Sequence, residues 1–376
     1  MKSKVKSNSR IKNSIDLPIF YTILLLVIIG IVMVFSASFV QAKFKVGDSF
    51  HFLKKNIVFS IIGTFVMLFV SNYDYRRYKK LDTLMLVGTF LLLCTVLWTP
   101  LGKELNNAKR WIMIGPITLM PSEIAKFTMI FLTAKIIENR KDKLHRPSVF
   151  IMPMFIALIF AFLIIKQPNL STAATIVLVC FTMLFIGGIP MRWVTMFIGA
   201  GVSLLALMIA IAPYRLQRFM TFLDPFKDPQ GEGFQVIQSL YALGSGGMWG
   251  LGLGKSRQKY FYLPEPQNDF IFSIIGEELG YIGCVLILLL FAFLIFRCIR
   301  VALKAPDLYS SMIVIGITAQ LTYQVLINVG VATSSIPNTG IALPFISYGG
   351  TSLVIFMGAM GVILNVSRYI ERGEKK

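Results

Sequence analysis

Ten runs of apolar residues, each close to the length needed to cross a bilayer, divide this chain. A spanning helix needs about 20 mostly apolar residues, because each helical residue rises only about 1.5 Å. Charge, proline or glycine separates the runs, which cover residues 17–40, 56–71, 83–99, 120–137, 148–165, 171–187, 191–212, 269–297, 310–334 and 345–367. The sequence therefore predicts an all-α polytopic membrane protein with ten transmembrane helices.

Composition excludes a soluble globular domain. Hydrophobic residues make up 56% of the 376 residues and charged residues only 15%, against about 25% charged in an average soluble domain. The formal net charge of +19 is read first as a signal of membrane orientation, and no nucleic acid is expected as a partner. The four cysteines stand singly, without a CxxC pair, so neither a disulfide framework nor a zinc site is predicted.

The chain is predicted to form one membrane domain, 17–367, between two short tails, 1–16 and 368–376. The first apolar run exceeds the h-region of a signal peptide, which indicates a retained helix. An even number of spans places both termini on one side, and that side carries the excess of Lys and Arg, which predicts that it is cytoplasmic. The opposite face then holds a long loop, 213–268, between the seventh and eighth helices.

A charge pair stands at the start of the fourth run. Glu123 and Lys126 are three residues apart, hence on one helical face. The helix dipole favours an acid in the first turn, but it opposes a cation there. Lys126 is therefore predicted to line a cavity that holds an anionic substrate or a carboxylate partner, and a purely structural pair with Glu123 is the alternative.

Further polar groups gather in the predicted outer loops. Arg110 and Trp111 are adjacent, where an arginine can grip phosphate and a tryptophan commonly anchors at headgroup depth. Arg215 and Arg218 open the long loop close to the membrane surface. These cations favour an anionic ligand at the outer face.

The rest of the long loop carries two patterns. Residues 234–243, with Gln235 and Gln238 three apart, form an amphipathic stretch too short to span and suited to an interfacial or re-entrant helix. The glycine-rich run 244–254 is either a flexible turn or a nest of backbone amides for an anion, and its spacing decides neither.

Asp269 lies where the polar loop meets the eighth apolar run. An aspartate at this place is suited to capping the following helix, a role worth about 1 kcal/mol. A carboxylate at the mouth of a membrane cavity is also partly desolvated, which raises its pKa towards that of a general base. The two roles are compatible.

The kinds of polar side chain in the sequence limit the reactions that the protein could catalyse. The sequence has only two histidines, His51 and His145, which provide neither a catalytic triad nor a zinc site. Several cations and a few carboxylates remain in the outer loops, which suits an anionic lipid that carries a diphosphate. Because a diphosphate is already a good leaving group, glycosyl transfer from such a lipid requires one carboxylate base together with cations or a metal ion.

Several separated motifs run along nearly the whole chain. They are Arg110-Trp111 with Pro121-Ser122-Glu123 and Lys126, Gln167-Pro168-Asn169-Leu170, Arg218 with Phe222, Asp224 and Pro225, Gly233-Phe234-Gln235 through Gln238-Ser239, Leu263-Pro264-Glu265 with Asp269-Phe270, Gly276-Glu277-Glu278-Leu279-Gly280, and Pro344-Phe345-Ile346-Ser347-Tyr348-Gly349-Gly350. Together and in this order, these motifs resemble those of the SEDS family of polytopic peptidoglycan polymerases.

The resemblance implies a bacterial cytoplasmic membrane enzyme that polymerises lipid II and releases undecaprenyl diphosphate. Asp269 takes the position of the family's essential aspartate and is the predicted base, with inversion by single displacement. A class B penicillin-binding protein and other divisome proteins are the implied partners, besides membrane lipid and the nascent glycan strand. A divalent cation, Mg²⁺ or Mn²⁺, is left open. The predicted substrate-binding residues are Glu123, Lys126, Arg110, Trp111, Arg215, Arg218, Gln235, Gln238, Lys259, Glu265 and Ser347.

The chain departs from the family pattern at a few positions. Asn169 stands where many members have aspartate, and residue 169 is therefore not among the predicted catalytic groups. The stretches 268–272 and 335–340 look more like the FtsW branch, which acts at the division septum, than the RodA branch of elongation. A lipid II flippase and a non-catalytic scaffold are the alternative functions.

Overall fold

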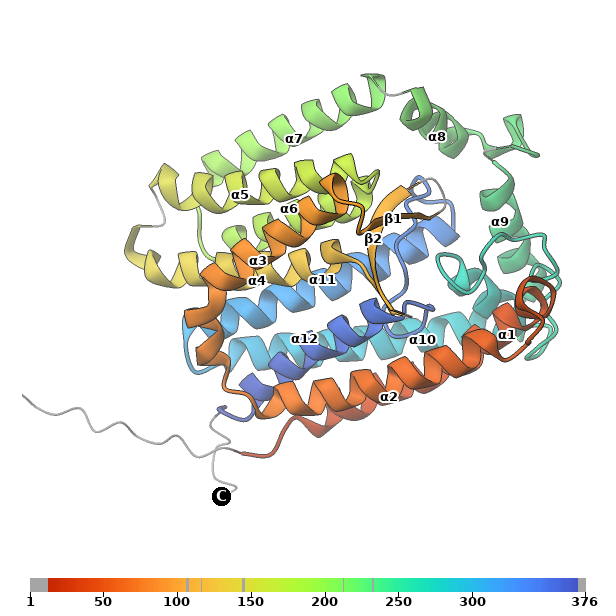
Figure 1. Ribbon diagram of the computed structural model, residues 1–376, viewed down its shortest axis with the longest axis horizontal. Coiled ribbons are helices and arrows are strands. Elements are labelled where there is room, and N and C mark those ends of the chain that lie inside the picture. Colours follow the sequence, from red (N-terminus) through yellow and green to blue (C-terminus); the bar gives the residue numbers. More distant parts are fainter. Residues whose placement is uncertain are drawn as a thin grey trace, which may run out of the picture.

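In a computed structural model the chain folds into a bundle of long helices that lie side by side (Figure 1). The structure describes residues 13–105, 108–115, 117–143, 146–211, 213–231 and 233–370. A helix lies over most of each of the ten predicted runs: α1 (Leu17–Val46), α2 (His51–Asn72), α3 (Tyr78–Trp98), α4 (Pro121–Asn139), α5 (Pro147–Lys166), α6 (Leu170–Ile186), α7 (Met191–Ile211), α10 (Ile271–Leu303), α11 (Leu308–Ala332) and α12 (Thr351–Ser367).

Some of these ten helices are both long enough and apolar enough to cross a membrane. Among the residues that the structure describes, six segments are long and apolar enough to cross a membrane: α1, α2, residues 75–98 with α3, α5, α10 and α11. Helices α6 and α12 are apolar but shorter. The mainly helical membrane fold is confirmed, whereas the count of ten spans stays a prediction.

The prediction of an all-α chain is wrong at one end of the bundle. Three strands form an antiparallel sheet in the order β1 (Gly102–Leu105), β2 (Ala108–Ile114) and β3 (Ile117–Leu119). The strands pair with one another, which satisfies backbone groups that an irregular loop would leave open. The sheet lies at the same end as the helices of the long loop (Figure 1).

The long loop 213–268 contains helices α8 (Pro213–Leu223) and α9 (Phe234–Gly246). Helix α9 confirms the short amphipathic helix that residues 234–243 predict, and α8 was not predicted. Single 3₁₀ turns occur at η1 (Tyr75–Arg77), η2 (Lys141–Lys143) and η3 (Pro225–Lys227).

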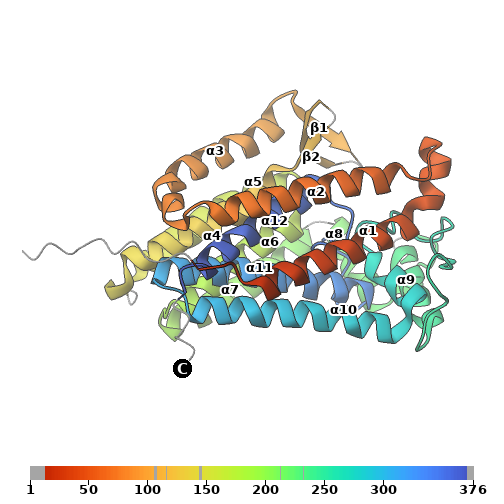
Figure 2. The same cartoon turned by 90° about the horizontal axis from the view of Figure 1, so that it is seen from below.

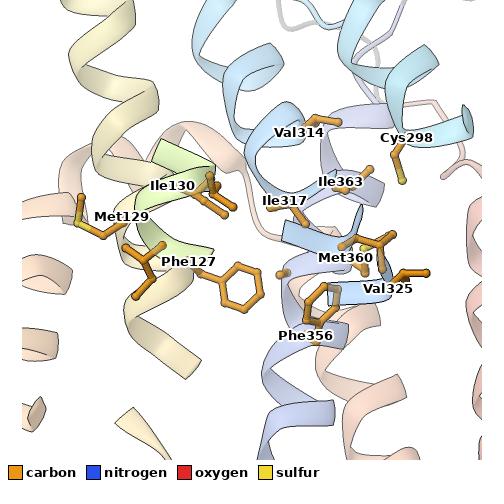
Figure 3. Close-up of a cluster of buried hydrophobic side chains, with 14 of the residues drawn as sticks. Phe127, Met129, Ile130, Cys298, Val314, Ile317, Val325, Phe356, Met360 and Ile363 are labelled. Carbon is orange, nitrogen blue, oxygen red and sulfur yellow. The ribbon is translucent and has the colours of Figure 1, made fainter. Parts of the chain in front are cut away.

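The bundle is layered, with α3 along one side, α10 along the opposite side, and α4, α6, α11 and α12 between them (Figure 2). Buried side chains of α4, α11 and α12 meet in the middle and point toward one another (Figure 3). The rings of Phe127 and Phe356 pack edge to face with centroids 5.5 Å apart. This apolar core lies directly beside Lys126, and it fixes the helices that carry the polar site.

Helix α10 is broken at Gly280, whose φ of 69° lies outside the helical range. The break separates N–H and C=O groups that would otherwise bond to each other within the helix. The glycine-rich segment 247–252 replaces those bonds: Tyr281 N–H donates to Gly247 O (2.9 Å), Ile282 N–H to Met248 O (3.2 Å), Leu251 N–H to Glu277 O (2.9 Å) and Gly252 N–H to Glu278 O (3.0 Å).

The close approach explains why this segment is rich in glycine. Gly250 has φ of +78°, and a Cβ there would lie 2.2 Å from the carbonyl oxygen of Glu278. Gly246 is just as crowded, because its Cβ would lie 1.9 Å from the carbonyl oxygen of Gly276. The segment is therefore packed against α10, and the interpretation of it as a flexible turn is wrong.

The first and last described residues lie together at the other end of the bundle. Asn13 N–H donates to Arg368 O (2.9 Å), and Asp16 N–H donates to Ser367 Oγ (3.0 Å). The Asp16 carboxylate also forms a 2.6 Å ion pair with Arg297 of α10. Both ends at one end of the bundle agree with an even number of spans; which side of the membrane they face stays a prediction.

Candidate functional site

A cavity of about 1120 Å³ has walls from the β2–β3 sheet, helices α2, α4, α6, α9 and α11, and the loops around 264–270 and 338–350. The structure brings a large part of the predicted site together here. The predicted residues that line the cavity are Asp269, Glu123, Lys126, Arg110, Trp111, Gln235 and Glu265. These residues come from four separate parts of the sequence, 110–111, 123–126, 235 and 265–269, and converge on one space.

Asp269 stands two residues before the start of α10 and is half-buried at the cavity wall. The N-cap of α10 is Phe270 and receives no side-chain hydrogen bond, so the predicted capping role of Asp269 is wrong. Its backbone carbonyl accepts a 2.8 Å hydrogen bond from Asn328 Nδ2. Among the described residues its carboxylate has neither a hydrogen bond nor an ion pair, which leaves it available to a ligand.

The surroundings of Asp269 change its acidity. Burial raises the pKa of Asp269 to about 6; the positive charge of Arg110 acts in the opposite direction, and the negative charge of Glu265 adds to the rise. A carboxyl group with such a pKa is ionised near neutral pH and is still basic enough to take a proton from a hydroxyl group in a transition state.

Arg110 on β2 reaches across to the turn between α5 and α6. Its Nε donates to Gln167 O at 3.0 Å, and its terminal nitrogen donates to Pro168 O. These bonds hold the guanidinium on the cavity wall, near enough to Asp269 to affect its pKa. The next residue, Asn169, caps α6 by accepting from Thr172 N–H at 3.2 Å and also lines the cavity.

Glu123 and Lys126 combine the two alternatives that the sequence left open. They form an ion pair of 2.8 Å, with the side chains 10% and 2% exposed, and both also line the cavity. A buried pair of this kind is costly to break, because the remaining charge would be left without a partner. The pair therefore places a fixed cation and a fixed anion in the wall of the site.

The segment 335–344 closes the site behind Asp269. Asn328 Nδ2 donates both to Asp269 O and to Ile341 O, each at 2.8 Å. Ser171 Oγ donates to Thr339 O at 2.8 Å, which ties the segment to α6. At Gly340, where φ is +66°, a Cβ would lie 3.3 Å from Asp269 Oδ2.

Asn328 and Gly340 were missed by reasoning from the sequence. The available signal was a polar stripe, Gln320, Gln324 and Asn328, at helical spacing within an apolar run. All three are buried in α11, and Gln324 also lines the cavity.

Three predicted substrate-binding residues lie away from the cavity wall. Lys259 is wholly buried in a 2.9 Å ion pair with Glu278 and does not line the cavity, so a role for it in substrate binding stays a prediction. Ser347 is 4% exposed, and its Oγ accepts from Leu343 N–H at 2.8 Å within a turn. Gln238 does not line the cavity. The side chains of Arg215 and Arg218 lie outside the described residues.

The carboxylates of the cavity do not gather as metal ligands. Among the described residues, no three His, Cys, Asp or Glu side chains lie close enough together to hold a metal ion. Glu123 is paired with Lys126, and Glu265 with Lys45 at 2.8 Å. These residues do not fit a divalent cation, and no step of the proposed reaction is assigned to one.

The fold and the cavity define a polytopic helical membrane protein with a polar site that contains both cations and a free carboxylate. The chain matches the FtsW, RodA and SpoVE family model, described as cell cycle protein, over residues 16–372, and it belongs to this family. The match confirms the resemblance to the SEDS family.

Relatives align over almost their full length. The chain is 46% identical to stage V sporulation protein E of Bacillus subtilis (strain 168), with 95% of this chain and 98% of the relative covered. It is 40% identical to a protein of Geobacter sp. (strain M18) named "Probable peptidoglycan glycosyltransferase FtsW", with 94% and 96% covered.

Solved structures share the fold. A chain from "Structural coordination of polymerization and crosslinking by a peptidoglycan synthase complex" has a TM-score of 0.78 and 30% identity, covering 94% of this chain and 98% of that one. The rod-shape-determining protein RodA of Thermus thermophilus has a TM-score of 0.70 and 27% identity, covering 95% and 98%.

Proposed function

We propose that this protein is a peptidoglycan glycosyltransferase that polymerises lipid II at the outer face of the bacterial cytoplasmic membrane. One observation carries the proposal: Asp269, a half-buried carboxylate without a partner among the described residues, faces a cavity whose wall also holds Arg110 and Lys126. The Geobacter relatives, named as peptidoglycan glycosyltransferases, support the same activity.

The reaction follows from the charges in the cavity. The Asp269 carboxylate takes the proton of the acceptor sugar's 4-hydroxyl group while that oxygen attacks the anomeric carbon of the lipid-linked strand. The bond from this carbon to the diphosphate breaks, and the electron pair leaves with undecaprenyl diphosphate. Arg110 and Lys126 stabilise the negative charge that develops on the leaving group. A single displacement inverts the configuration at the anomeric carbon.

The apolar part of the wall suits a lipid-linked substrate. Val58, Phe59 and Ile62 of α2 line the same cavity as the charged groups, with Lys54 and Lys55 one turn away. A polyprenyl chain that lies along α2 therefore presents its diphosphate to cations. In this arrangement the ten long helices span the membrane, both termini are cytoplasmic and the loop 213–268 lies outside.

The process and the partners are proposed from the relatives. An FtsW-like role implies synthesis at the division septum with a class B penicillin-binding protein that cross-links the strands, together with other divisome proteins. The similarity to a chain from a complex that couples polymerization to crosslinking supports the first of these partners.

The test is gel-resolved polymerisation of labelled lipid II by the purified protein with its transpeptidase partner. We expect Asp269→Asn to reduce the rate by roughly 10²–10⁴-fold, as loss of a general base does, while the protein stays folded. Asp74→Asn is the matched control: Asp74 accepts from Arg76 N–H at the far end of the bundle, and asparagine caps equally well. Equal strands from wild type and Asp269→Asn would remove the proposed base.

A further inference from the structure

A second cavity, of about 330 Å³, adjoins the first and shares Gln235, Pro264 and Asn338 with it. The rest of its wall comes from α8, the start of α9, residues 230–231 and the segment 334–338. Asn338 Nδ2 donates to Gln235 Oε1 at 2.9 Å, so the partition between the two cavities is a pair of hydrogen-bonded amides. Pro264, the third shared residue, directly precedes Glu265 of the larger cavity.

The two cavities differ in charge. The larger one has lysines, an arginine and three carboxylates in its wall. None of the described residues that line the smaller one is charged; its polar groups are amides and hydroxyls, as in Gln230, Thr221 and Ser334. Two aromatic rings, Phe222 and Phe234, complete the wall. A diphosphate gains nothing from such a wall, because its charges would meet no cation there.

A neutral sugar matches this lining. Amide and hydroxyl groups both donate and accept hydrogen bonds, as sugar hydroxyls and N-acetyl groups require, and an aromatic face packs against the C–H face of a pyranose ring. The volume stands at the lower end of the range of small-molecule sites, roughly 300–1,000 Å³, which is too small for a lipid-linked diphosphate.

We propose that the smaller cavity is a saccharide subsite that binds an uncharged N-acetylhexosamine unit of the glycan strand next to the reacting unit. The inference rests on the proposed function, since it requires that the larger cavity hold the reacting sugar. The partition of Gln235 and Asn338 then lies beside the glycosidic bond that joins the two units. A strand held in this way is retained between successive additions.

The first test fills the subsite without touching the larger cavity. Thr221→Trp places an indole in it, and Leu223→Trp is the control on the same helix, at a residue that is 63% exposed and outside the cavity wall. On labelled lipid II we expect Thr221→Trp to yield strands at least several-fold shorter and to slow the first coupling as well, because the disaccharide of lipid II already places an N-acetylhexosamine next to the reacting unit. Strand lengths equal to those of Leu223→Trp would overturn the subsite.

The second test separates failure of the inference from failure of the proposed function. The probe is fluorescently labelled chitotetraose, an uncharged oligomer without lipid or diphosphate. We expect wild type and Asp269→Asn to bind it equally, and Thr221→Trp and Phe222→Ala to bind it about tenfold more weakly than Leu223→Trp does. Absence of saturable binding to wild type, or equal binding by all variants, overturns the subsite whether or not strands are made. A wild type that binds the probe but makes no strands contradicts the proposed function alone.

Discussion

Carboxylates near the start of α10 lie in two contrasting environments, one fully buried and hydrogen-bonded and the other open to the cavity. Glu277 and Glu278 are fully buried, and their oxygens accept from Ser36, Ser256, Lys259 and the backbone of residues 254–258. Asp269, eight residues earlier, is half-buried, and no described group bonds its carboxylate. Buried carboxylates whose oxygens accept several hydrogen bonds stabilise the structure, whereas a carboxylate without such bonds can accept a proton.

The paired carboxylates explain how the long loop is held. Segment 254–259 wraps the two glutamates, and the backbone of 247–252 bridges the break in α10. Ser36 adds α1 to the same cluster through a bond of 2.6 Å to Glu278. The loop that carries Glu265 and Asp269 is therefore anchored by this cluster of buried carboxylates and their partners.

Removing one partner of the buried Lys259–Glu278 ion pair should have the largest effect on stability. Lys259→Met leaves the Glu278 charge buried without its cation, and we expect a loss of about 3–5 kcal/mol in the free energy of unfolding. Thermal unfolding of the detergent-solubilised protein, monitored by size-exclusion chromatography after heating, measures the loss of stability.

The double variant Lys259→Met/Glu278→Gln removes both charges at similar volume and should recover much of the loss. If the single variant were as stable as wild type, the cluster would not anchor the loop.

Asn328 offers the next largest effect, on rate more than on stability. Asn328→Leu deprives the carbonyls of Asp269 and Ile341 of their shared donor, and displacement of a catalytic group by about 1 Å costs roughly 10²-fold in rate. Polymerisation rates report the effect. Thr322→Val is the control on α11, because among the described residues the Thr322 hydroxyl bonds only to Thr318 O within the helix. Equal rates for the two variants would show that Asn328 does not position Asp269.

The smallest expected effect separates contact from backbone strain. An alanine at Gly340 costs about 1–2 kcal/mol for its left-handed conformation and brings a Cβ to 3.3 Å from Asp269 Oδ2. Gly47→Ala has a similar φ of +79° with no atom within 4 Å. We expect both variants to lose similar stability and only Gly340→Ala to slow polymerisation, by a few-fold. A rate loss in both would remove the contact as the cause.

The sequence predicted the elements that depend on composition and local pattern. Apolar length located the ten long helices, and amphipathic spacing located α9. The motif residues Glu123, Lys126, Arg110 and Asp269 indeed meet in one cavity. Each of these features is carried by residues close together in the chain or by a resemblance that spans it.

The features that were missed depend on contacts between distant residues. Lys259 is nineteen residues from Glu278 and over two hundred from Ser36, so nothing local showed that its charge was already paired. Gly340 acquires its role only because the fold brings it against Asp269. The strands of 102–119 are short and lie in a segment that local pattern describes only as a loop.

The measurement that tests the central claim most directly is the pH dependence of the polymerisation rate. Because burial raises the pKa of Asp269 to about 6, the base form is lost as the pH falls through 6. We therefore expect a rate that is constant above this value and falls about tenfold per pH unit below it, with one proton involved, in wild type and in the control Asp74→Asn alike. A rate that stays constant down to pH 5, with the protein folded, would contradict a catalytic role for the Asp269 carboxylate.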